Sequence, residues 1–373
     1  MTKRADIVII GAGIAGASLA AEVADHASVV LIEAEAQPGY HSTGRSAAFW
    51  SETYGGPMVR PLTSASGPFL ADPPAAFADR SFLSPRGALH IAGGEGQAAL
   101  DGLCDEFSGS GVTMTRLDRD ALETMIPGLL PGWDDGVMEP SCTDIDVARL
   151  HAAYLKSAQR RGATLLVGAR VEKMEQTSGG WRLETREGAV EAGVVVNAAG
   201  AWADEVARLA GARPLGVQPY RRTIIQLRTD PAAPADLPLV IDALGRFYFK
   251  PEAGGRLWLS PHDETACAAC DCAPEEIDIA SAIDRFQRVV DWQVERVEHS
   301  WAGLRSFAPD RLPVYGFDAS VPGFFWCAGQ GGFGIQTAPA AARLAASLLL
   351  GTTPEPMIAG IDSSLYLAGR FMN

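Results

Sequence analysis

The sequence lacks the features of several protein classes. It contains no uninterrupted apolar run of transmembrane length, no repeat of fixed period and no low-complexity segment. Basic residues are in deficit, since 31 Lys and Arg stand against 45 Asp and Glu, for a formal net charge of −14. That balance argues against nucleic-acid binding and against attraction to anionic membranes. No signal peptide precedes the first predicted strand, so we expect a cytoplasmic protein without membrane insertion.

Cysteine is also scarce, with six residues in a chain of 373. Three of them are scattered, and we expect them to be reduced packing residues: Cys104, Cys142 and Cys327. The other three form a CxxCxC cluster: Cys267, Cys270 and Cys272. Three thiolates could bind zinc or an iron–sulfur centre, but a complete site needs a fourth ligand, for which His262 is the only close candidate. We therefore favour a surface loop with incidental cysteines, and expect no metal.

The sequence does contain a glycine-rich turn between an apolar strand and an Ala-rich helix, GAGIAG at residues 11–16. Gly11 allows a tight turn, Gly13 lets the backbone approach a phosphate, and Gly16 lets the helix pack against the strand. A second apolar strand, residues 28–32, ends on Glu33, whose carboxylate can accept a hydrogen bond from a ribose hydroxyl. This context indicates a dinucleotide site. The alternative is a tight turn without a ligand, and the motif alone does not separate NAD from FAD.

Two further turns of small residues follow apolar strands later in the chain. Residues 193–202 and 323–337 each lead from a strand into a helix and offer backbone groups for the close approach of a ligand. Residues 82–92 are predicted as one strand, and a strand over 164–171 is predicted to open a three-stranded meander. With 47% hydrophobic side chains, the chain is expected to fold as a globular protein of two or three domains.

Taken in order, five motifs resemble the D-amino acid oxidase superfamily of FAD enzymes: residues 11–16, 44–48, 195–202, 301–305 and 330–337. Residues 37–48 and 301–307 look closest to the bacterial D-arginine dehydrogenase type. The resemblance covers nearly the whole chain. It implies an α/β fold with a discontinuous, Rossmann-like FAD-binding domain of the glutathione-reductase type and an α+β substrate domain with an antiparallel sheet. The expected FAD-binding domain is residues 1–82, 144–214 and 299–373, and the substrate domain is 83–143 and 215–298.

The resemblance also implies the reaction and the residues that bind the substrate. A hydride would pass from Cα of a D-amino acid to flavin N5, and the imine would hydrolyse to a 2-oxo acid and ammonia. Arg222 and Arg305 match the carboxylate-binding arginines of the family and would position the substrate as bidentate forks. Arg221 should point to the opposite face of the strand. The other matches are two substrate-facing tyrosines and a seat whose backbone carbonyl accepts from the substrate amine: Tyr54, Tyr248, Gly331 and Gly332.

The FAD-binding residues implied by the resemblance come from the three turns, from the loop after the second strand and from isolated positions elsewhere. They are Gly11, Gly13, Ile14, Ala15, Gly16, Glu33, Ala34, Ser42, Thr43, Arg45, Ser46, Ala47, Ala48, Val171, Ala198, Ala199, Gly200, Trp202, Gly303, Gly331, Gly332, Phe333, Gly334, Ile335, Gln336 and Thr337. Ser306 stands where the related sarcosine oxidases carry a flavin-linking cysteine, so FAD is expected to be bound non-covalently.

Two departures from the D-arginine enzyme concern the substrate side chain. Ala88 stands where that enzyme has an acidic residue, and Phe49, followed by Trp50, stands where it has a histidine. Loss of a carboxylate and gain of aromatic surface should disfavour arginine and lysine and favour a neutral, hydrophobic or aromatic side chain. His90 lies two residues beyond Ala88 on a predicted strand and shares its face.

Three alternatives stay open from the sequence. One is a glycine/sarcosine-type secondary amine oxidase, the second is a 2-hydroxy acid dehydrogenase on the same scaffold, and the third is a flavin-binding electron-transfer or regulatory subunit without turnover. Release of ammonia rather than an aldehyde would separate the first from a D-amino acid enzyme. The sequence does not determine whether oxygen or a quinone reoxidises the flavin, nor the chirality of the substrate, nor the oligomeric state.

Overall fold

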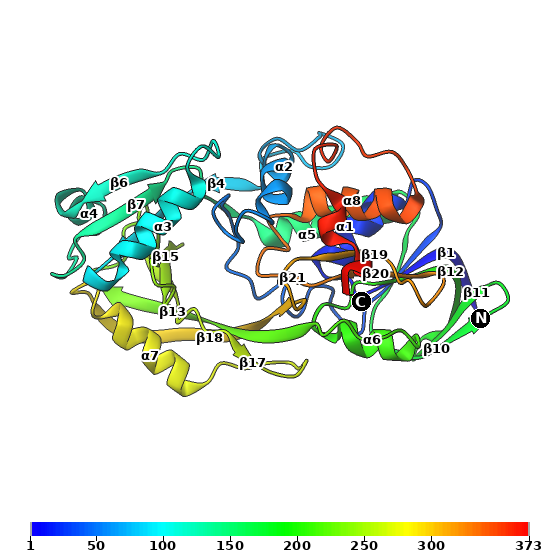
Figure 1. Ribbon diagram of the computed structural model, residues 1–373. Helices are drawn as coiled ribbons and strands as arrows, with labels where there is room; N and C mark the ends of the chain where they lie inside the picture. The colour runs from blue at the N-terminus through cyan, green and yellow to red at the C-terminus, as the bar shows by residue number, and fades with distance from the viewer. Residues whose placement is uncertain (1, 372–373) are drawn as a thin grey trace.

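A computed structural model describes residues 2–371, and two large sheets dominate the fold (Figure 1). The first sheet has eight strands in the order β10-β11-β12-β1-β2-β9, with β20 beside β12 and β19 beside β20. Its parallel strands each contain an apolar run, such as residues 7–10 of the first strand, as expected where both faces of a sheet are covered. They are β1 (Lys3–Ile10), β2 (Val29–Ile32), β9 (Thr164–Leu166), β12 (Gly188–Asn197) and β20 (Phe324–Ala328).

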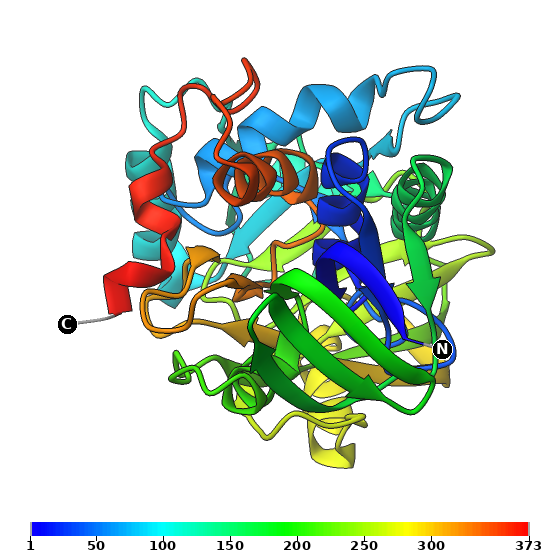
Figure 2. The ribbon, with the colours of Figure 1, turned by 90° about the vertical axis from the view of Figure 1, so that its right-hand side faces the viewer.

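Helices rich in alanine cover one face of this sheet. Helix α1 (Ile14–Val23) packs against both α5 (Val147–Arg160) and α8 (Ala338–Leu350), and Figure 2 shows α1 and α8 side by side over the strands. The small side chains permit this close approach. Further elements complete the unit: α2 (Arg60–Ala71), β10 (Val171–Thr177), β11 (Gly180–Thr185), α6 (Ala203–Leu209) and β19 (Val314–Phe317).

The second sheet has ten strands in the order β21-β18-β13-β16-β15-β14-β5-β7-β6, with β17 beside β13. Its long antiparallel pair, β13 (Gln218–Asp230) and β18 (Gln293–Phe307), runs back toward the first sheet (Figure 1). One face is closed by α4 (Arg119–Met125) and α7 (Glu276–Phe286). The remaining strands are β5 (Ala88–Ala92), β6 (Thr115–Asp118), β7 (Asp135–Glu139), β14 (Leu239–Asp242), β15 (Tyr248–Glu252), β16 (Arg256–Ser260), β17 (Thr265–Ala266) and β21 (Gln330–Gly331).

A small third sheet joins β3 (Phe49–Trp50) and β4 (Leu83–Pro85) to opposite edges of β8 (Thr143–Ile145). Helix α3 (Gln97–Phe107) packs on β5 and β7. In the described part of the chain, every helix is too short or too polar to cross a bilayer.

The predicted α/β fold with a second, largely antiparallel sheet is confirmed, but two predicted strands are divided. Residues 82–92 form β4 and β5, which are separated by Gly87 at φ 74°. Residues 164–171 do not open the meander: β9 pairs with β2, the chain turns at Gly168 with φ 64°, and the meander is β10, β11 and β12. Strand β18 runs without a break through residue 299, and the division into domains stays a prediction.

Candidate active site

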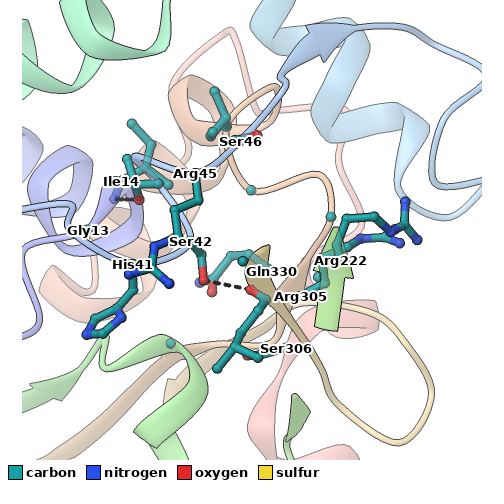
Figure 3. A pocket seen from close by; sticks show the side chains of 18 of the residues that line it. Gly13, Ile14, His41, Ser42, Arg45, Ser46, Arg222, Arg305, Ser306 and Gln330 are labelled. Carbon is teal, nitrogen blue, oxygen red and sulfur yellow. Dashed lines mark hydrogen bonds between the residues drawn. The ribbon is translucent and has the colours of Figure 1, made fainter. Parts of the chain in front are cut away.

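A cavity of about 710 Å³ is lined by residues from both large sheets and from all three glycine-rich turns. Figure 3 shows Gly13 and Ile14 toward one end of it and Arg222 toward the other. Most of the predicted site residues line this cavity, and those that do not are Gly16, Trp50, Ala88, Phe333 and Thr337. Which of the lining residues bind a ligand stays a prediction.

The turn between β1 and α1 is shaped by its glycines. Gly11 has φ 103°, and a Cβ there would lie 2.4 Å from the carbonyl oxygen of Ala198. A Cβ on Gly16 would lie 1.9 Å from the carbonyl oxygen of Gly11, so Gly16 serves helix packing and does not face the cavity. Gly13 is the N-cap of α1 and supplies no side-chain cap. The helix N-terminus is therefore closely packed and carries positive dipole character toward the cavity.

Two side chains from other segments hold this turn. The amide of Ala12 donates to Oε2 of Glu33 at 3.0 Å, and the amide of Ile14 donates to Oγ1 of Thr43 at 3.0 Å. Oε1 of Glu33 accepts from the amide of Glu35 at 2.9 Å. Glu33 thus stands at the end of β2, as the motif predicts, and keeps further lone pairs for a hydroxyl group.

His151 of α5 is a residue of this region that the sequence did not single out. Its Nε2 lies 2.8 Å from the carbonyl oxygen of Ala12, and because a carbonyl can only accept, Nε2 carries the proton. Burial lowers the pKa of His151, which favours the neutral ring. A single histidine in a helical pattern gives no signal of this contact.

The loop after β2 is tied to β18. Ser42 Oγ donates to the carbonyl oxygen of Leu304 at 2.6 Å (Figure 3). Nη1 of Arg45 donates to the carbonyl oxygens of Ala302 at 3.1 Å and Cys272 at 3.0 Å, and its Nη2 pairs with Asp271. The guanidinium of Arg45, which was predicted to bind the cofactor, is therefore largely occupied by contacts within the protein.

The substrate-side arginines lie on the paired strands β13 and β18. Nε of Arg222 donates to the carbonyl oxygen of Asp263 at 2.8 Å, and within residues 2–371 neither of its Nη atoms has a hydrogen-bond partner. Nη2 of Arg305 donates to Tyr54 Oη at 2.5 Å, and its Nη1 lies 3.3 Å from Glu264 Oε1. Burial, and then the charge of Arg305, lower the pKa of Arg222. Two such guanidinium groups in one cavity form a site for an anion.

Strand alternation separates Arg222 from its neighbour. Arg221 pairs with Glu275 and, at 2.8 Å, with Asp278, on the side of the sheet where α7 lies. Only Arg222 lines the cavity. This is the arrangement that the period of two predicts.

Gly332 has a steric role beside the Arg305–Tyr54 pair. A Cβ at this position would lie 2.2 Å from Tyr54 Oη and 2.3 Å from Nε of Arg305. Any side chain there would displace both groups. Phe333, in contrast, turns away and packs against Tyr54 and Phe307 at ring distances of 6.2 and 5.9 Å.

Two residues that were expected to contact the substrate do not line the cavity. The first is Trp50. Its neighbour Phe49 lines the cavity, but Trp50 is on the other face of β3, where its Nε1 donates to the carbonyl oxygen of Thr63 at 2.9 Å. Ala88 is fully buried in a cluster with Tyr248 and other apolar side chains. The effect of Ala88 is therefore indirect: it leaves that part of the sheet without a carboxylate.

A buried carboxylate organises the segment that leads to Tyr54. Oε2 of Glu139, on β7, accepts from Ser51 Oγ at 2.8 Å and Thr53 Oγ1 at 2.6 Å. Burial raises the pKa of Glu139 although these donors oppose the shift. From the other side, Nε2 of Gln336 donates to the carbonyl oxygen of Tyr54 at 3.1 Å. The amide of Gln336, predicted to bind the cofactor, thus holds this segment in place.

The CxxCxC cluster lies outside the cavity, and its three thiols are free. Nδ1 of His262, the candidate fourth ligand, lies 2.7 Å from the carbonyl oxygen of Gly245, and its ring lines the cavity instead. Within residues 2–371 there is no group of three side chains arranged as metal ligands.

Several known proteins are similar to this chain in sequence. Hydrogen cyanide synthase subunit HcnC of Pseudomonas aeruginosa is 27% identical over 261 residues, which make up 68% of this chain and 59% of HcnC. Mitochondrial dimethylglycine dehydrogenase of Rattus norvegicus is 27% identical over 254 residues, 62% of this chain and 29% of that protein. The matched part of this chain thus spans less than two thirds of these relatives.

Solved structures agree in fold. Glycine oxidase from Geobacillus kaustophilus superposes with a TM-score of 0.85 at 24% identity, covering 98% of both chains. L-proline dehydrogenase from P. horikoshii superposes with a TM-score of 0.82 at 21% identity, covering 96% of both. The finer resemblance to D-arginine dehydrogenases stays a prediction. A family model for FAD dependent oxidoreductases (DAO) matches residues 6–348, and the chain therefore belongs to this family of FAD enzymes.

Proposed function

We propose that the protein oxidises an α-amino acid with a neutral, hydrophobic or aromatic side chain, with D-amino acids as the preferred class. The observation that carries this proposal is the pair Arg222 and Arg305, whose guanidinium groups line a cavity that also reaches the dinucleotide-type turn. A carboxylate is the substrate group that such a pair binds best, because each guanidinium offers parallel N–H donors. A flavin-binding protein without turnover would not need the two arginines at the end of the cavity away from the dinucleotide-type turn.

In the proposed reaction the substrate loses two electrons and two protons. Bound FAD supplies the two-electron acceptor for the hydride from Cα, while the amine nitrogen loses a proton. One water then hydrolyses the imine to a 2-oxo acid and ammonia. The electrons pass on to molecular oxygen or to a quinone.

The residues around the turn fit a dinucleotide. Helix α1 follows its N-cap Gly13, whose lack of a side chain lets a pyrophosphate group approach the helix N-terminus, and Glu33 suits a ribose hydroxyl. Among the described residues that line the cavity there is no cysteine. Ser306 lines it at the position where sarcosine oxidases carry the cysteine that links the flavin. We therefore propose non-covalent FAD.

The apolar surface near the arginines supports an uncharged substrate side chain. The ring of Phe49 packs against that of Tyr54 at a centroid distance of 5.3 Å and an angle of 56°, and Ile224 and Ile241 line the same cavity. A cationic side chain would lie near two guanidinium groups, and Ala88 supplies no compensating carboxylate.

A second candidate is the oxidation of an N-substituted glycine. It is favoured by the similarity to dimethylglycine dehydrogenase, which is named for such a substrate. Both candidates use the same carboxylate-binding pair. They differ in products, since oxidation and hydrolysis of a secondary amine give a carbonyl compound and a primary amine, whereas an α-amino acid with a free amino group gives a 2-oxo acid and ammonia.

An anaerobic mixing experiment tests the proposal. The purified yellow protein is mixed with D- and L-amino acids, N-methyl amino acids and 2-hydroxy acids, and bleaching of the flavin absorbance is followed. We expect neutral D-amino acids to bleach it fastest and to release ammonia. Fastest bleaching by D-Arg or D-Lys would contradict the assigned side-chain preference, and absence of bleaching by every amine would contradict the proposed activity.

A further inference from the structure

One polar atom of the cavity has no role in binding a carboxylate, an amine or a dinucleotide. Nε2 of His90 is buried and, within residues 2–371, has no hydrogen-bond partner. The ring lines the same cavity as Arg222 and Tyr248. Nε2 is covered by neighbouring atoms in this structure, so a ligand group that displaces them from the cavity side would supply a hydrogen bond that the nitrogen otherwise lacks.

The register of the second sheet fixes where His90 lies. His90 pairs with Ile241 across β5 and β14, and Ile241 pairs with Tyr248 across β14 and β15. Cross-strand partners share a face, and all three side chains line the cavity. The neighbouring residues Leu89 and Val240 point to the opposite face and belong to the core under α4 and α7.

The three side chains Tyr248, Ile241 and His90 form a row across the sheet, with polar side chains at its two ends and an apolar one between them. Two strand spacings separate the backbones of Tyr248 and His90, which is about 10 Å. Tyr248 stands at the end near Arg222, whose charge acts on its phenol, while Ile241 forms an apolar middle. A substrate held by its carboxylate at the arginines would therefore extend an apolar segment over Ile241 before a polar tip reached His90.

The charge state of His90 selects the polar tip. Burial lowers the pKa of His90 to about 4, so the ring is neutral near pH 7. In a neutral imidazole one ring nitrogen donates and the other accepts, so Nε2 makes a single hydrogen bond and the ring carries no charge to balance an ionic group. The tip is accordingly a neutral hydroxyl or N–H group, and an aromatic ring supplies the rigid apolar segment.

From this arrangement we propose that His90 is a specificity residue, and that the preferred substrate is an aromatic amino acid whose ring carries a neutral polar atom, a phenol or an indole. The inference rests on the proposed function, because the substrate carboxylate is placed at Arg222 and Arg305. A site built to bind a hydroxyl disfavours the analogue that lacks it, since the buried partner is then left unsatisfied.

The direct experiment compares tyrosine with phenylalanine, in the enantiomer that the enzyme oxidises. We expect kcat/KM for tyrosine to exceed that for phenylalanine at least tenfold in the wild type. In His90→Leu the ratio should fall to about one. In His90→Gln, which keeps a hydrogen-bonding tip, a preference for tyrosine should remain. His26→Leu, at an exposed histidine outside the cavity, is the matched control and should keep the wild-type ratio.

A binding measurement keeps the inference testable if the variants turn over poorly. The perturbation of the flavin spectrum gives Kd values for 4-hydroxyphenylacetate and phenylacetate, which differ only in the hydroxyl group. We expect a ratio of at least tenfold in the wild type and about one in His90→Leu. An equal preference for the two substrates in the wild type, or a ratio unchanged in His90→Leu, would overturn the role of His90. If no amino acid reduces the flavin, the proposed function fails instead, and the Kd ratio still decides whether His90 reads a hydroxyl.

Discussion

The two ends of the cavity are built in different ways. At the dinucleotide-type turn, the shape is set mainly by glycines and backbone amides, and the glycines lie close together in sequence, at residues 11–16. At the substrate end, side chains from distant segments converge: Tyr54, His90, Arg222, Tyr248 and Arg305. The first end is therefore sensitive to added atoms, and the second to lost charges and hydrogen bonds.

The largest effect is expected from a methyl group at the turn. In Gly11→Ala the new Cβ would lie 2.4 Å from the carbonyl oxygen of Ala198, at φ 103°. We expect the variant to purify without flavin and with a lower Tm, because both the clash and the left-handed backbone oppose alanine. The ratio of absorbance at 450 to 280 nm measures the flavin content. Gly360→Ala, where a Cβ meets open space, is the control, and a yellow Gly11→Ala protein would contradict the assigned role.

Neighbouring arginines give the second test, since one faces the cavity and the other does not. Arg222→Met should lower kcat/KM by about 10²–10³ with the flavin retained, because a charge-assisted fork to the carboxylate is lost. Arg221→Met should leave kcat/KM within about threefold but lower the free energy of unfolding by about 1–3 kcal/mol, since Glu275 and Asp278 lose their partner. Steady-state kinetics and denaturant titration separate the two effects. A reversed pattern would place the wrong arginine in the site.

Buried histidines should make the substrate end sensitive to acid. Burial lowers the pKa values of His90 and His262 to about 4, below the ordinary value of 6.5. Between these pH values the unfolded chain binds more protons, so their contribution to stability is present above pH 6.5 and is lost as the pH falls through 4. In His90→Leu the fall in unfolding free energy between pH 7 and pH 4 should be smaller by about 2 kcal/mol. Urea titrations at both pH values check this, and an unchanged fall would mean that His90 is not held neutral.

The smallest effect is expected from a single side-chain contact at the turn. Thr43→Val removes the acceptor for the amide of Ile14 and keeps the shape of the side chain. We expect a loss of about 1 kcal/mol in stability, as for a helix cap, and FAD binding weaker by less than tenfold. Thr43→Ser should behave as the wild type. Titration of the apoprotein with FAD measures the affinity, and a complete loss of flavin in Thr43→Val would assign Thr43 a larger role than the turn geometry supports.

Much of the fold could be predicted because its signals are local. The glycine-rich turn, the two later turns and the apolar strands that precede them indicated an FAD-type α/β fold, and the family match agrees. Alternation along one strand was enough to separate Arg221 from Arg222. The two divided strands were missed because Gly87 and Gly168 take positive φ angles that a β-rich pattern does not reveal.

The sequence by itself predicted a dinucleotide site at the glycine-rich turn, because the turn depends on short-range backbone conformation. FAD and the pair of arginines were predicted from the resemblance to a family, and the family match supports FAD. Only the tertiary structure decided which candidates share the cavity. Trp50 packs on α2, Ala88 is buried beneath the surface, and Arg45 and Gln336 are engaged in holding loops. The contacts of Glu139 and His151 join segments that are about 90 and 140 residues apart, and no local pattern encodes them. A hydrogen bond between distant segments exists only once the chain has folded, and such bonds hold both the turn at Ala12 and the segment that leads to Tyr54.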